Sequence, residues 1–519
     1  MKHFTVFSHR SFNRIVGTIF MLLLSFGIVI AQPDTKEFEK YIDKARADWD
    51  VPGMAVAIVK DGKIVFEEGF GVLESGKKQK VDENSLFAIA SNTKAFTAAS
   101  LAILVDEGKI SWSDKVKDYL PYFALYDSYV SEHATIADLL SHRIGLGTFS
   151  GDVIWYKSNY TAEEVIKHAR YVPQAYGFRD GYGYSNLMFI TAGEVIKAVS
   201  GQSWGQFIKQ HFFMPLGMDR TQTTVTELAK MKDVATPHGL VDNVNTPIPY
   251  VNWDNMGAAG GIISSVHDMA QWMNLQLNHG VVGADTLFSP ERQIDMWTPH
   301  NSFRVSSGSK RNLPSRHFSG YGFGWGLSDY KGNLIVSHSG GYDGMYSRVT
   351  LVPDQNLGIV ILTNAMRGVS YPVAMHLIDA YVGGDQKDWS AEYLPGAKRG
   401  IDWKKQRIQK RIDARVLNTK PSVSEDAFVG SYYDPMFGEV DIKKDDKGLR
   451  MEFMSAPSLN AQLSHWHYNT YKIEWNELHA WFSFGTIQFV LDNNQEVTGI
   501  EFDVPNDDIF FDEIHLKRK

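Results

Sequence analysis

The sequence predicts a mixed α/β (α+β) body followed by a small C-terminal β-domain, and three observations carry this prediction. Over residues 34–385, stretches with helical spacing of apolar residues mix with strand-like runs and glycine-rich turns. Over residues 421–519, short strands separated by turn residues are typical of a small β-barrel or sandwich. The chain has 519 residues, 44% of them hydrophobic, which is enough for several domains with sizeable cores.

The composition excludes several classes of function. The chain contains no cysteine, which rules out disulfides, thiolate nucleophiles, cysteine-ligated zinc and iron–sulfur clusters. The formal net charge of −8 provides no basic footprint for nucleic acid, so we expect no nucleic-acid partner. Any catalysis must therefore come from Ser, His, Lys, Tyr, Asp or Glu side chains or from a bound ligand.

Residues 1–31 predict a secretory signal peptide. Basic residues and no acid occupy positions 1–14, residues 15–30 are almost all apolar, and Ala31 is a small residue suited to cleavage. An uncleaved membrane anchor is the alternative, but the apolar run falls short of the ~20 residues that a spanning helix needs. We expect an exported protein, periplasmic or secreted, with no stable membrane span after cleavage.

Residues 32–385 are expected to form one domain, whose elements follow from periodicity. Two hairpins are predicted, over 54–64 with a turn at 60–63 and over 348–363 with a turn at 353–356. Helical spacing of apolar residues predicts helices over 36–47, 94–107, 134–141, 162–170, 186–199, 203–213 and 266–279.

Residues 386–420 are predicted to be a basic linker that contains a helix over 403–415. Residues 398–420 carry nine Lys or Arg against two Asp. A solvated linker helix is favoured over a nucleic-acid arm, because the protein is acidic and expected to be exported. In the β-domain, hairpins are predicted over 438–454, with a turn at 445–448, and over 481–504, with a turn at 492–495.

Ser91 and Lys94 are the first candidate catalytic residues. They form a Ser-x-x-Lys pattern, and on a helix positions i and i+3 share one face. A lysine kept neutral by burial or by a neighbouring cation can accept the serine proton. The same pattern begins at Ser75, Ser307 and Ser328, but only Ser91 opens a long apolar helix. The alternative is that Ser91 merely caps that helix.

Tyr184 and Asn186 form the second candidate element, between a glycine-rich stretch and a predicted helix. A tyrosine whose pKa is lowered by neighbouring cations can shuttle a proton. Asn186 can bind a substrate amide or hold the lysine. The alternative is a glycine-rich turn with an aromatic cap.

His338, Gly340 and Gly341 form the third candidate element, at the end of a strand-like run over 333–337. The glycines let a substrate backbone approach closely, and the Gly341 N–H can pair with the Ser91 N–H as an oxyanion hole. His338 is expected to be a switchable cation beside a carboxylate or amide. The alternative is a simple turn at the end of the strand.

Two further patterns are given structural interpretations. Residues 201–205 match the Gly-x-Ser-x-Gly elbow of α/β-hydrolases, but a predicted helix rather than a strand precedes them. We therefore expect Gly201 to end one helix and Ser203 to cap the next. The cluster from His465 to His467 is typical of packing rather than of a metal site, because no acidic ligand accompanies it.

The order Ser-x-x-Lys, Tyr-x-Asn, His-x-Gly resembles the serine β-lactamase and penicillin-binding-protein superfamily. The sequence is most similar to class C β-lactamases and to related DD-peptidases, D-aminopeptidases and esterases. The resemblance covers residues 36–385 and includes Val51–Ala57, Leu139–His142 and Pro215–Met218. It implies an antiparallel sheet flanked by helices, an all-helical lobe and a site between them. Residues 421–519 more loosely resemble the lipocalin-like β-barrel domain appended to some of these hydrolases.

The resemblance also implies roles for the candidate residues and requires no cofactor and no metal. Ser91 would be the acylated nucleophile, and Lys94 and Tyr184 would share general-base and general-acid work. Residues Asn186, His338, Gly340 and Gly341 would contact the substrate, and Gly341 would complete the oxyanion hole. His338 stands where class C β-lactamases usually carry lysine, which favours peptidase, aminopeptidase or esterase activity.

We therefore expect an exported serine hydrolase that forms an acyl-enzyme on Ser91 and cleaves an amide, peptide or ester bond. Its expected partner is a small-molecule or peptide substrate, including one derived from peptidoglycan. The alternatives are a β-lactamase and a penicillin- or peptidoglycan-recognising binding protein with little turnover. The sequence predicts no oligomeric state.

Overall fold

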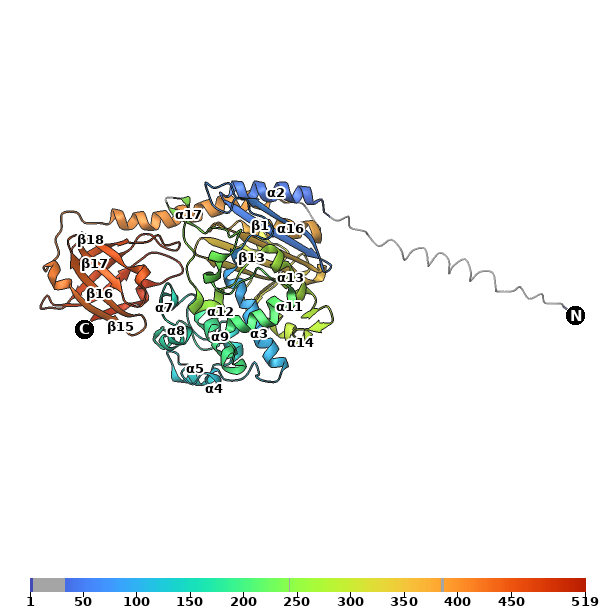
Figure 1. Ribbon diagram of the computed structural model, residues 1–519, viewed down its shortest axis with the longest axis horizontal. Coiled ribbons are helices and arrows are strands. Elements are labelled where there is room, and N and C mark those ends of the chain that lie inside the picture. The colour runs from blue at the N-terminus through green and yellow to red at the C-terminus, as the bar shows by residue number, and fades with distance from the viewer. Residues whose placement is uncertain (3–32, 242, 384–386) are drawn as a thin grey trace.

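The computed structural model describes residues 1–2, 33–241, 243–383 and 387–519. The predicted signal peptide lies outside the described residues, apart from its first two positions, and stays a prediction. In Figure 1 the red C-terminal barrel lies at the left, the mixed body lies to its right, and helix α17 (Trp389–Asp413) runs along the top between them. Within the described ranges, every helix is too short or too polar to cross a bilayer.

One eight-stranded sheet forms the centre of the body. Its neighbouring strands are all antiparallel and follow the order β2-β1-β14-β13-β12-β11-β10-β9. Both predicted hairpins of the body are confirmed. The strand expected over 333–337 continues to Tyr342, so His338 and the glycines after it lie within a strand. The strands are β1 (Gly53–Lys60), β2 (Lys63–Gly71), β9 (Asn301–Ser302), β10 (Ser319–Tyr321), β11 (Gly326–Tyr330), β12 (Asn333–Tyr342), β13 (Met345–Val352) and β14 (Leu357–Thr363).

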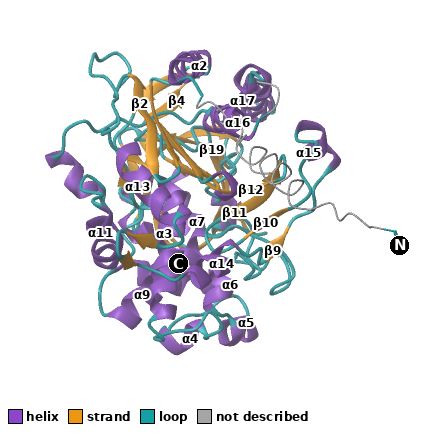
Figure 2. Ribbon diagram, turned by 90° about the vertical axis from the view of Figure 1, so that its right-hand side faces the viewer, coloured by secondary structure: helices purple, strands orange, loops and turns teal. Residues whose placement is uncertain are grey.

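Alternating side chains on these strands bury two apolar faces. On β12, for example, Ile335 belongs to one core and Val336 to the other, as the two-residue period of a strand requires. One face packs against α2 (Thr35–Asp48), α16 (Ser370–Val382) and the start of α17. The other packs against α3 (Thr93–Asp106) and α13 (Val266–Leu277), and Figure 2 shows these two helical layers on opposite sides of the strands.

Short helices form a lobe below the sheet, around α3 and α9. The helices predicted from periodicity are confirmed, several of them shorter than expected. Gly201 ends α9 in a left-handed conformation and Ser203 caps α10, as expected, so residues 201–205 form no hydrolase elbow. The helices are α4 (Val116–Tyr119), α5 (Ser128–His133), α6 (Ile136–Leu140), α7 (Asp152–Trp155), α8 (Ala162–His168), α9 (Asn186–Ser200), α10 (Trp204–Ile208), α11 (Met214–Leu216), α12 (Gly257–Gly260), α14 (Pro290–Trp297) and α15 (Ser307–Asn312).

Among the described residues of the body, three small two-stranded sheets accompany the large one. They are β3 (Phe87–Ala88) with β6 (Ile263–Ser264), β4 (His238–Val241) with β5 (Val244–Pro247), and β7 (Val281–Val282) with β8 (Asp285–Thr286). The β3–β6 pair leads the chain directly to Ser91.

Helix α17 begins well before the predicted segment over 403–415. Pro395 and Gly396 lie inside it, and both residues disfavour a helix interior, so periodicity alone underestimates its length. The burial of Trp389 and Ser390 against the body stabilises its first turn.

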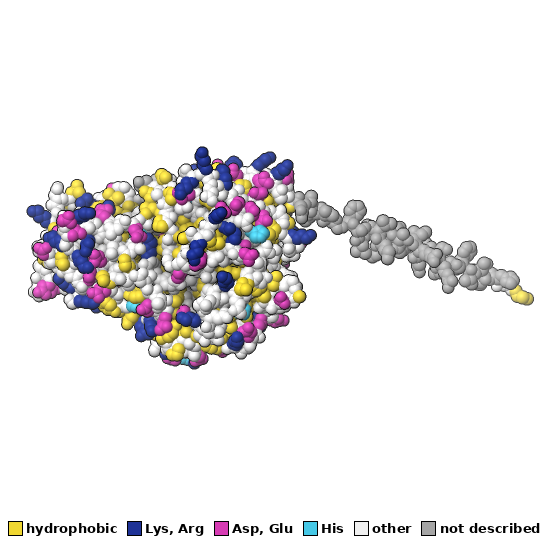
Figure 3. All heavy atoms as spheres, in the orientation of Figure 1, with side chains coloured by type: hydrophobic (Ala, Val, Ile, Leu, Met, Phe, Trp, Pro, Cys, Tyr) yellow, Lys and Arg dark blue, Asp and Glu magenta, His cyan; other side chains and the backbone are white. Residues whose placement is uncertain are grey.

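On the face drawn in Figure 3, basic and acidic side chains are interspersed and form no patch of one sign.

The C-terminal domain is a closed barrel of eight antiparallel strands. The hairpin over 438–454 is confirmed, and the second hairpin starts at Thr486 rather than at 481. Aromatic side chains such as Phe428, Phe453 and Phe489 fill the interior. The strands are β15 (Gly430–Asp434), β16 (Gly438–Asp445), β17 (Gly448–Phe453), β18 (Ala461–His467), β19 (Thr470–Trp475), β20 (Thr486–Leu491), β21 (Val497–Asp503) and β22 (His515–Arg518).

Candidate active site

Ser91 lies in a tight 3₁₀ turn, Ala90–Asn92, immediately before α3. Ala90 adopts a positive φ of 46°, which is uncommon for a residue with a Cβ and is tolerated where the surrounding structure enforces it. The turn is fixed from behind, because the Ile89 N–H donates to the Ile262 carbonyl (3.0 Å). Ser91 is therefore held at the N-terminus of a buried helix, where the helix dipole favours a developing anion.

Lys94 is fully buried one turn after Ser91. Its Nζ donates to Ser91 Oγ (3.1 Å), to Asn186 Oδ1 (2.7 Å) and to the Ala259 carbonyl (2.8 Å). Burial lowers the pKa of Lys94 to about 7, and the nearby Asp152 opposes this shift. An amine with this pKa exchanges a proton readily near neutrality.

Asp152, at the start of α7, fixes the orientation of Asn186. Its Oδ2 accepts a hydrogen bond from Asn186 Nδ2 (2.6 Å) and its Oδ1 accepts one from Trp155 Nε1 (2.9 Å). Asn186 must therefore present its oxygen to Lys94. Of the two roles expected for Asn186, the structure shows the one in which its amide holds the lysine. Burial raises the pKa of Asp152 to about 8. Sequence reasoning missed Asp152, because no spacing links it to the three motifs.

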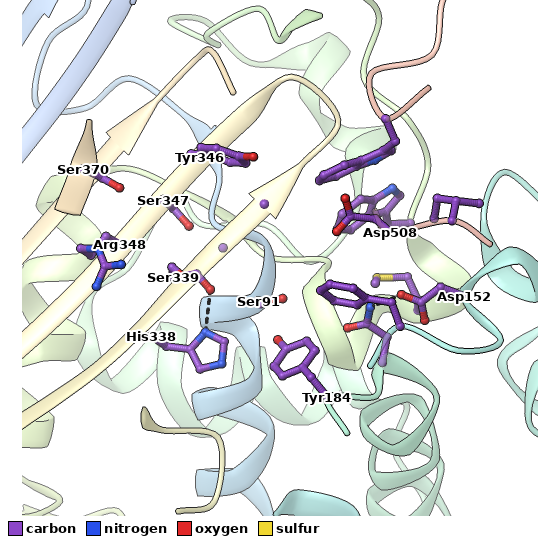
Figure 4. Close-up of a pocket in the computed structure, with 18 of the residues that line it drawn as sticks. Ser91, Asp152, Tyr184, His338, Ser339, Tyr346, Ser347, Arg348, Ser370 and Asp508 are labelled. Atoms are coloured by element: carbon purple, nitrogen blue, oxygen red, sulfur yellow. Dashed lines mark hydrogen bonds between the residues drawn. The ribbon is translucent and has the colours of Figure 1, made fainter. Parts of the chain in front are cut away.

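Tyr184 points its hydroxyl toward Ser91 without reaching hydrogen-bond geometry, and the hydroxyl is buried (Figure 4). Lys94 Nζ lies 4.8 Å from the centroid of the tyrosine ring. Tyr184 does not meet the condition that nearby cations lower its pKa, because burial raises that pKa well above its ordinary value. In this structure Tyr184 is a neutral phenol, which is a proton donor rather than a base.

His338 is held by a chain of hydrogen bonds that fixes its proton. The backbone N–H of Ser185 donates to Nδ1 of His142 (3.0 Å), so Nε2 of His142 carries the proton and donates to the Tyr321 hydroxyl (3.3 Å). Tyr321 then donates to Nε2 of His338 (3.1 Å). Nδ1 of His338 donates to the Ser339 carbonyl (2.6 Å), as the dashed line in Figure 4 shows.

This chain requires neutral imidazoles at both histidine positions. Burial, with the positive charge of Lys94 beside it, lowers the pKa of His338 to about 3. The expectation of a switchable cation at His338 is therefore wrong. His338 instead belongs to a chain of hydrogen bonds that runs through Tyr321 and His142 to Ser185, the N-cap of α9. Its side chain also lines the cavity with Ser91.

The end of β12 leaves one backbone edge free beside Ser91. Strand β11 pairs with β12 only as far as Ser337, so residues 338–342 pair with β13 alone. A Cβ on Gly340 would lie 2.2 Å from the Ile89 carbonyl oxygen, so only glycine allows this strand to approach the Ser91 turn. Gly341 follows in this segment and lines the cavity.

A cavity of about 480 Å³ joins these groups (Figure 4). Ser91, Tyr184, Asn186, His338, Gly340 and Gly341 all line it, while Lys94 lies behind Ser91. The charged and aromatic lining residues that sequence reasoning missed include Arg348, Trp481 and Asp508. The last two belong to the barrel domain and meet the site only through tertiary packing.

No group of His, Asp and Glu residues within the described ranges is arranged to hold a metal ion. At the sequence cluster on β18, His465 bonds the Tyr468 carbonyl (2.9 Å) and His467 accepts from the Val416 N–H (3.1 Å). Arg415 lies over the ring of Trp466. These contacts have the character of packing.

The chain belongs to the Beta-lactamase family, whose sequence model matches residues 38–382. Residues 414–518 match a domain of unknown function (DUF3471). The predicted β-lactamase/transpeptidase-like fold with a C-terminal barrel is confirmed.

Similar proteins carry both hydrolase and penicillin-binding names. The unguisins hydrolase ungD' of Aspergillus campestris is 28% identical over 443 residues, which are 80% of this chain and 79% of that protein. Penicillin-binding protein 4 of Amycolatopsis lactamdurans is 27% identical over 343 residues, or 65% of this chain and 87% of that protein. An octameric penicillin-binding protein homologue from Pyrococcus abyssi shares the fold, with a TM-score of 0.61 and 22% identity over 94% of this chain and 100% of that one.

Proposed function

We propose that the protein is a serine hydrolase that forms an acyl-enzyme on Ser91 and cleaves an amide, peptide or ester bond. The observation that carries the proposal is the buried amine of Lys94, 3.1 Å from Ser91 Oγ and with a pKa near 7. A group that is close, correctly oriented and neutral near physiological pH is what a general base requires.

Acylation uses Lys94 as the base. Lys94 Nζ takes the proton of Ser91 Oγ, and Oγ bonds to the substrate carbonyl carbon to give a tetrahedral oxyanion. The Ser91 and Gly341 N–H groups are proposed to stabilise this oxyanion. When the carbonyl–nitrogen or carbonyl–oxygen bond breaks, the Tyr184 hydroxyl protonates the leaving group and recovers its proton from Lys94.

Deacylation reverses these roles with water. The neutral lysine removes a proton from a water molecule, which attacks the ester carbonyl and releases the carboxylic acid. Ser91 Oγ regains its proton, so the net reaction consumes one water per bond cleaved. Asn186 and Asp152 keep Lys94 in position throughout. If the side-chain amide of Asn186 rotated by 180°, Lys94 would lose the oxygen that accepts its hydrogen bond.

The direct test is covalent labelling with a serine-reactive fluorophosphonate, followed by intact mass and peptide mapping. We expect one adduct, on Ser91, and none in Ser91→Ala. Ser307→Ala is the matched control, because Ser307 starts another Ser-x-x-Lys sequence but is exposed on α15. An unlabelled wild type, or an adduct that persists in Ser91→Ala, contradicts the proposal.

Penicillin distinguishes this proposal from its two alternatives. A lasting adduct on Ser91 without turnover indicates a penicillin-recognising site with slow deacylation. Consumption of penicillin without a lasting adduct indicates a β-lactamase. We expect the protein to cleave an open-chain amide or ester faster than it reacts with penicillin in either way.

We also propose export, on the pattern of residues 1–31. N-terminal sequencing of the mature protein from cells that secrete it is expected to begin just after Ala31. A mature protein that retains Met1 contradicts this part of the proposal without affecting the rest.

A further inference from the structure

The barrel reaches into the catalytic cavity through the segment that follows β21. This segment is attached on one side to α17, where Asp507 pairs with Lys404 (2.9 Å) and Arg407 (2.7 Å). On the other side Glu513 accepts a hydrogen bond from the Gly151 N–H (2.7 Å) of the helical lobe. The segment is thus fixed at both ends, and Asp508 between them lines the cavity.

Asp508 is a partly buried carboxylate on the cavity wall without a partner of its own. No hydrogen bond or ion pair to its side chain is found among the described residues, whereas the adjacent Asp507 has two. Burial raises the pKa of Asp508 to about 6, with Asp507 reinforcing and Lys404 opposing the shift. Trp481 lines the same end of the cavity. An unpaired carboxylate beside an aromatic ring suits a small cation.

Arg348 carries the opposite charge to Asp508 and lies at another part of the cavity wall. Its guanidinium lies 5.1 Å from the centroid of the Tyr371 ring, its Nε is buried without a partner, and no described carboxylate pairs with it. Burial lowers the pKa of Arg348 to about 10, so it stays charged at neutral pH. A buried guanidinium of this kind suits a planar carboxylate.

The two charges lie at opposite ends of the substrate edge. Arg348 pairs in register with Ser339, and Tyr346 pairs with Gly341, two residues further along β12. Trp481 lies at the Gly341 end, since a Cβ on Gly341 would be 3.2 Å from its ring, and Asp508 is close enough to Tyr346 to raise the pKa of that tyrosine. In Figure 4 Ser91 lies between Arg348 and Asp508.

We propose that the cavity binds a short peptide with both ends free, its ammonium group at Asp508 and Trp481, its carboxylate at Arg348, and the bond that Ser91 attacks between them. This inference rests on the proposed function and names its substrate class. The unmatched charges select against chains blocked at either end, because a blocked end leaves one of these two partly buried charges unpaired. The barrel therefore selects the amino end, and the body selects the carboxyl end.

The test measures how four ligands slow fluorophosphonate labelling of Ser91: alanyl-alanine, its N-acetyl form, its C-terminal amide and the doubly blocked form. Each is used in the L,L and D,D series, because the structure favours neither. We expect the free dipeptide of one series to protect Ser91 about tenfold or more better than any blocked form.

Two variants assign the ends separately. Asp508→Asn is expected to abolish the preference for a free amine and keep the preference for a free carboxylate, and Arg348→Gln the reverse. Asp512→Asn is the matched control, since this exposed acid on the same segment does not line the cavity. Equal or better protection by blocked peptides, no protection by any of them, or an unchanged preference in Asp508→Asn overturns the inference. Labelling of Ser91 in those same experiments leaves the proposed function standing, whereas absent labelling removes the function itself.

Discussion

The two ends of the catalytic cavity are built in different ways. At the serine end, Ser91, Lys94 and Asn186 are tied together by short hydrogen bonds and are enclosed by the body of the protein. At the barrel end, Trp481 and Asp508 come from a separate domain, and Asp508 makes no hydrogen bond or ion pair with the described residues of the body. The amine of Lys94 is fully hydrogen-bonded within the body, whereas Asp508 presents an unmatched charge.

This difference separates chemistry from selection. Buried polar groups whose hydrogen bonds are complete are rigid, and they preserve the geometry that proton transfer needs. A buried charge without a partner is costly, and it is best accounted for by a ligand that completes it. We infer that the body supplies the reaction and that the barrel contributes to the choice of substrate.

The largest effect is expected from the serine end. Lys94→Ala removes the general base and leaves Asn186 without its donor, so turnover is expected to fall by about 10³-fold or more. The measurement is kcat/KM on the best substrate, with folding checked by thermal unfolding. Lys310→Ala, at the corresponding position of the Ser307 sequence, is the matched control. Activity within a few-fold of wild type would contradict the role of Lys94.

A smaller effect is expected from Asp152, which acts through Asn186. Asp152→Ala is expected to lower kcat by about 10- to 100-fold with little change in KM, because the amide can then rotate away from Lys94. Asp152→Asn keeps an acceptor oxygen and is expected to restore most of kcat. Because burial raises the pKa of Asp152 to about 8, this carboxyl is mostly protonated where Lys94 titrates near pH 7, so Asp152→Asn is expected to shift the acid limb of the rate profile only slightly. If Asp152→Ala instead raised KM with little change in kcat, Asp152 would act in substrate binding.

The smallest effects are expected where the barrel is attached. Arg407→Ala breaks a half-exposed ion pair to Asp507, and such pairs contribute little. Glu513→Ala removes a partly buried acceptor of the Gly151 N–H and is expected to disturb the Asp508 segment more. Preference for the free-amine peptide is the readout, and it is expected to change less than about threefold in Arg407→Ala. A larger loss in Arg407→Ala than in Glu513→Ala would reverse this ranking.

Local sequence patterns predicted much of the fold and those site residues that belong to the three motifs. The hairpins of β1–β2 and β13–β14 and the long helix α3 follow from periodicity and turn residues, and Ser91 was distinguished from three similar serines by the helix after it. Asp152, Arg348 and Asp508 could not be found in this way. They reach the cavity from separate elements, so their proximity depends on tertiary packing that no spacing records.

Charge states were the other property that the sequence could not predict. Tyr184 and His338 were expected to carry or exchange charge, because cations are near them or their ordinary pKa allows it. The structure encloses both, and the cost of desolvating a charge then outweighs those influences. Residue type indicates which groups can titrate, while burial determines whether they do.

The most direct test of the central claim is the rate of Ser91 labelling by the fluorophosphonate as a function of pH. Burial lowers the pKa of Lys94 to about 7, so the amine is protonated and inactive below that pH and free above it. The account predicts a labelling rate that rises with pH to a plateau, with a midpoint near 7, and that is slow at every pH in Lys94→Ala. A rate that is independent of pH between 5 and 9, or a profile that Lys94→Ala leaves unchanged, would contradict it.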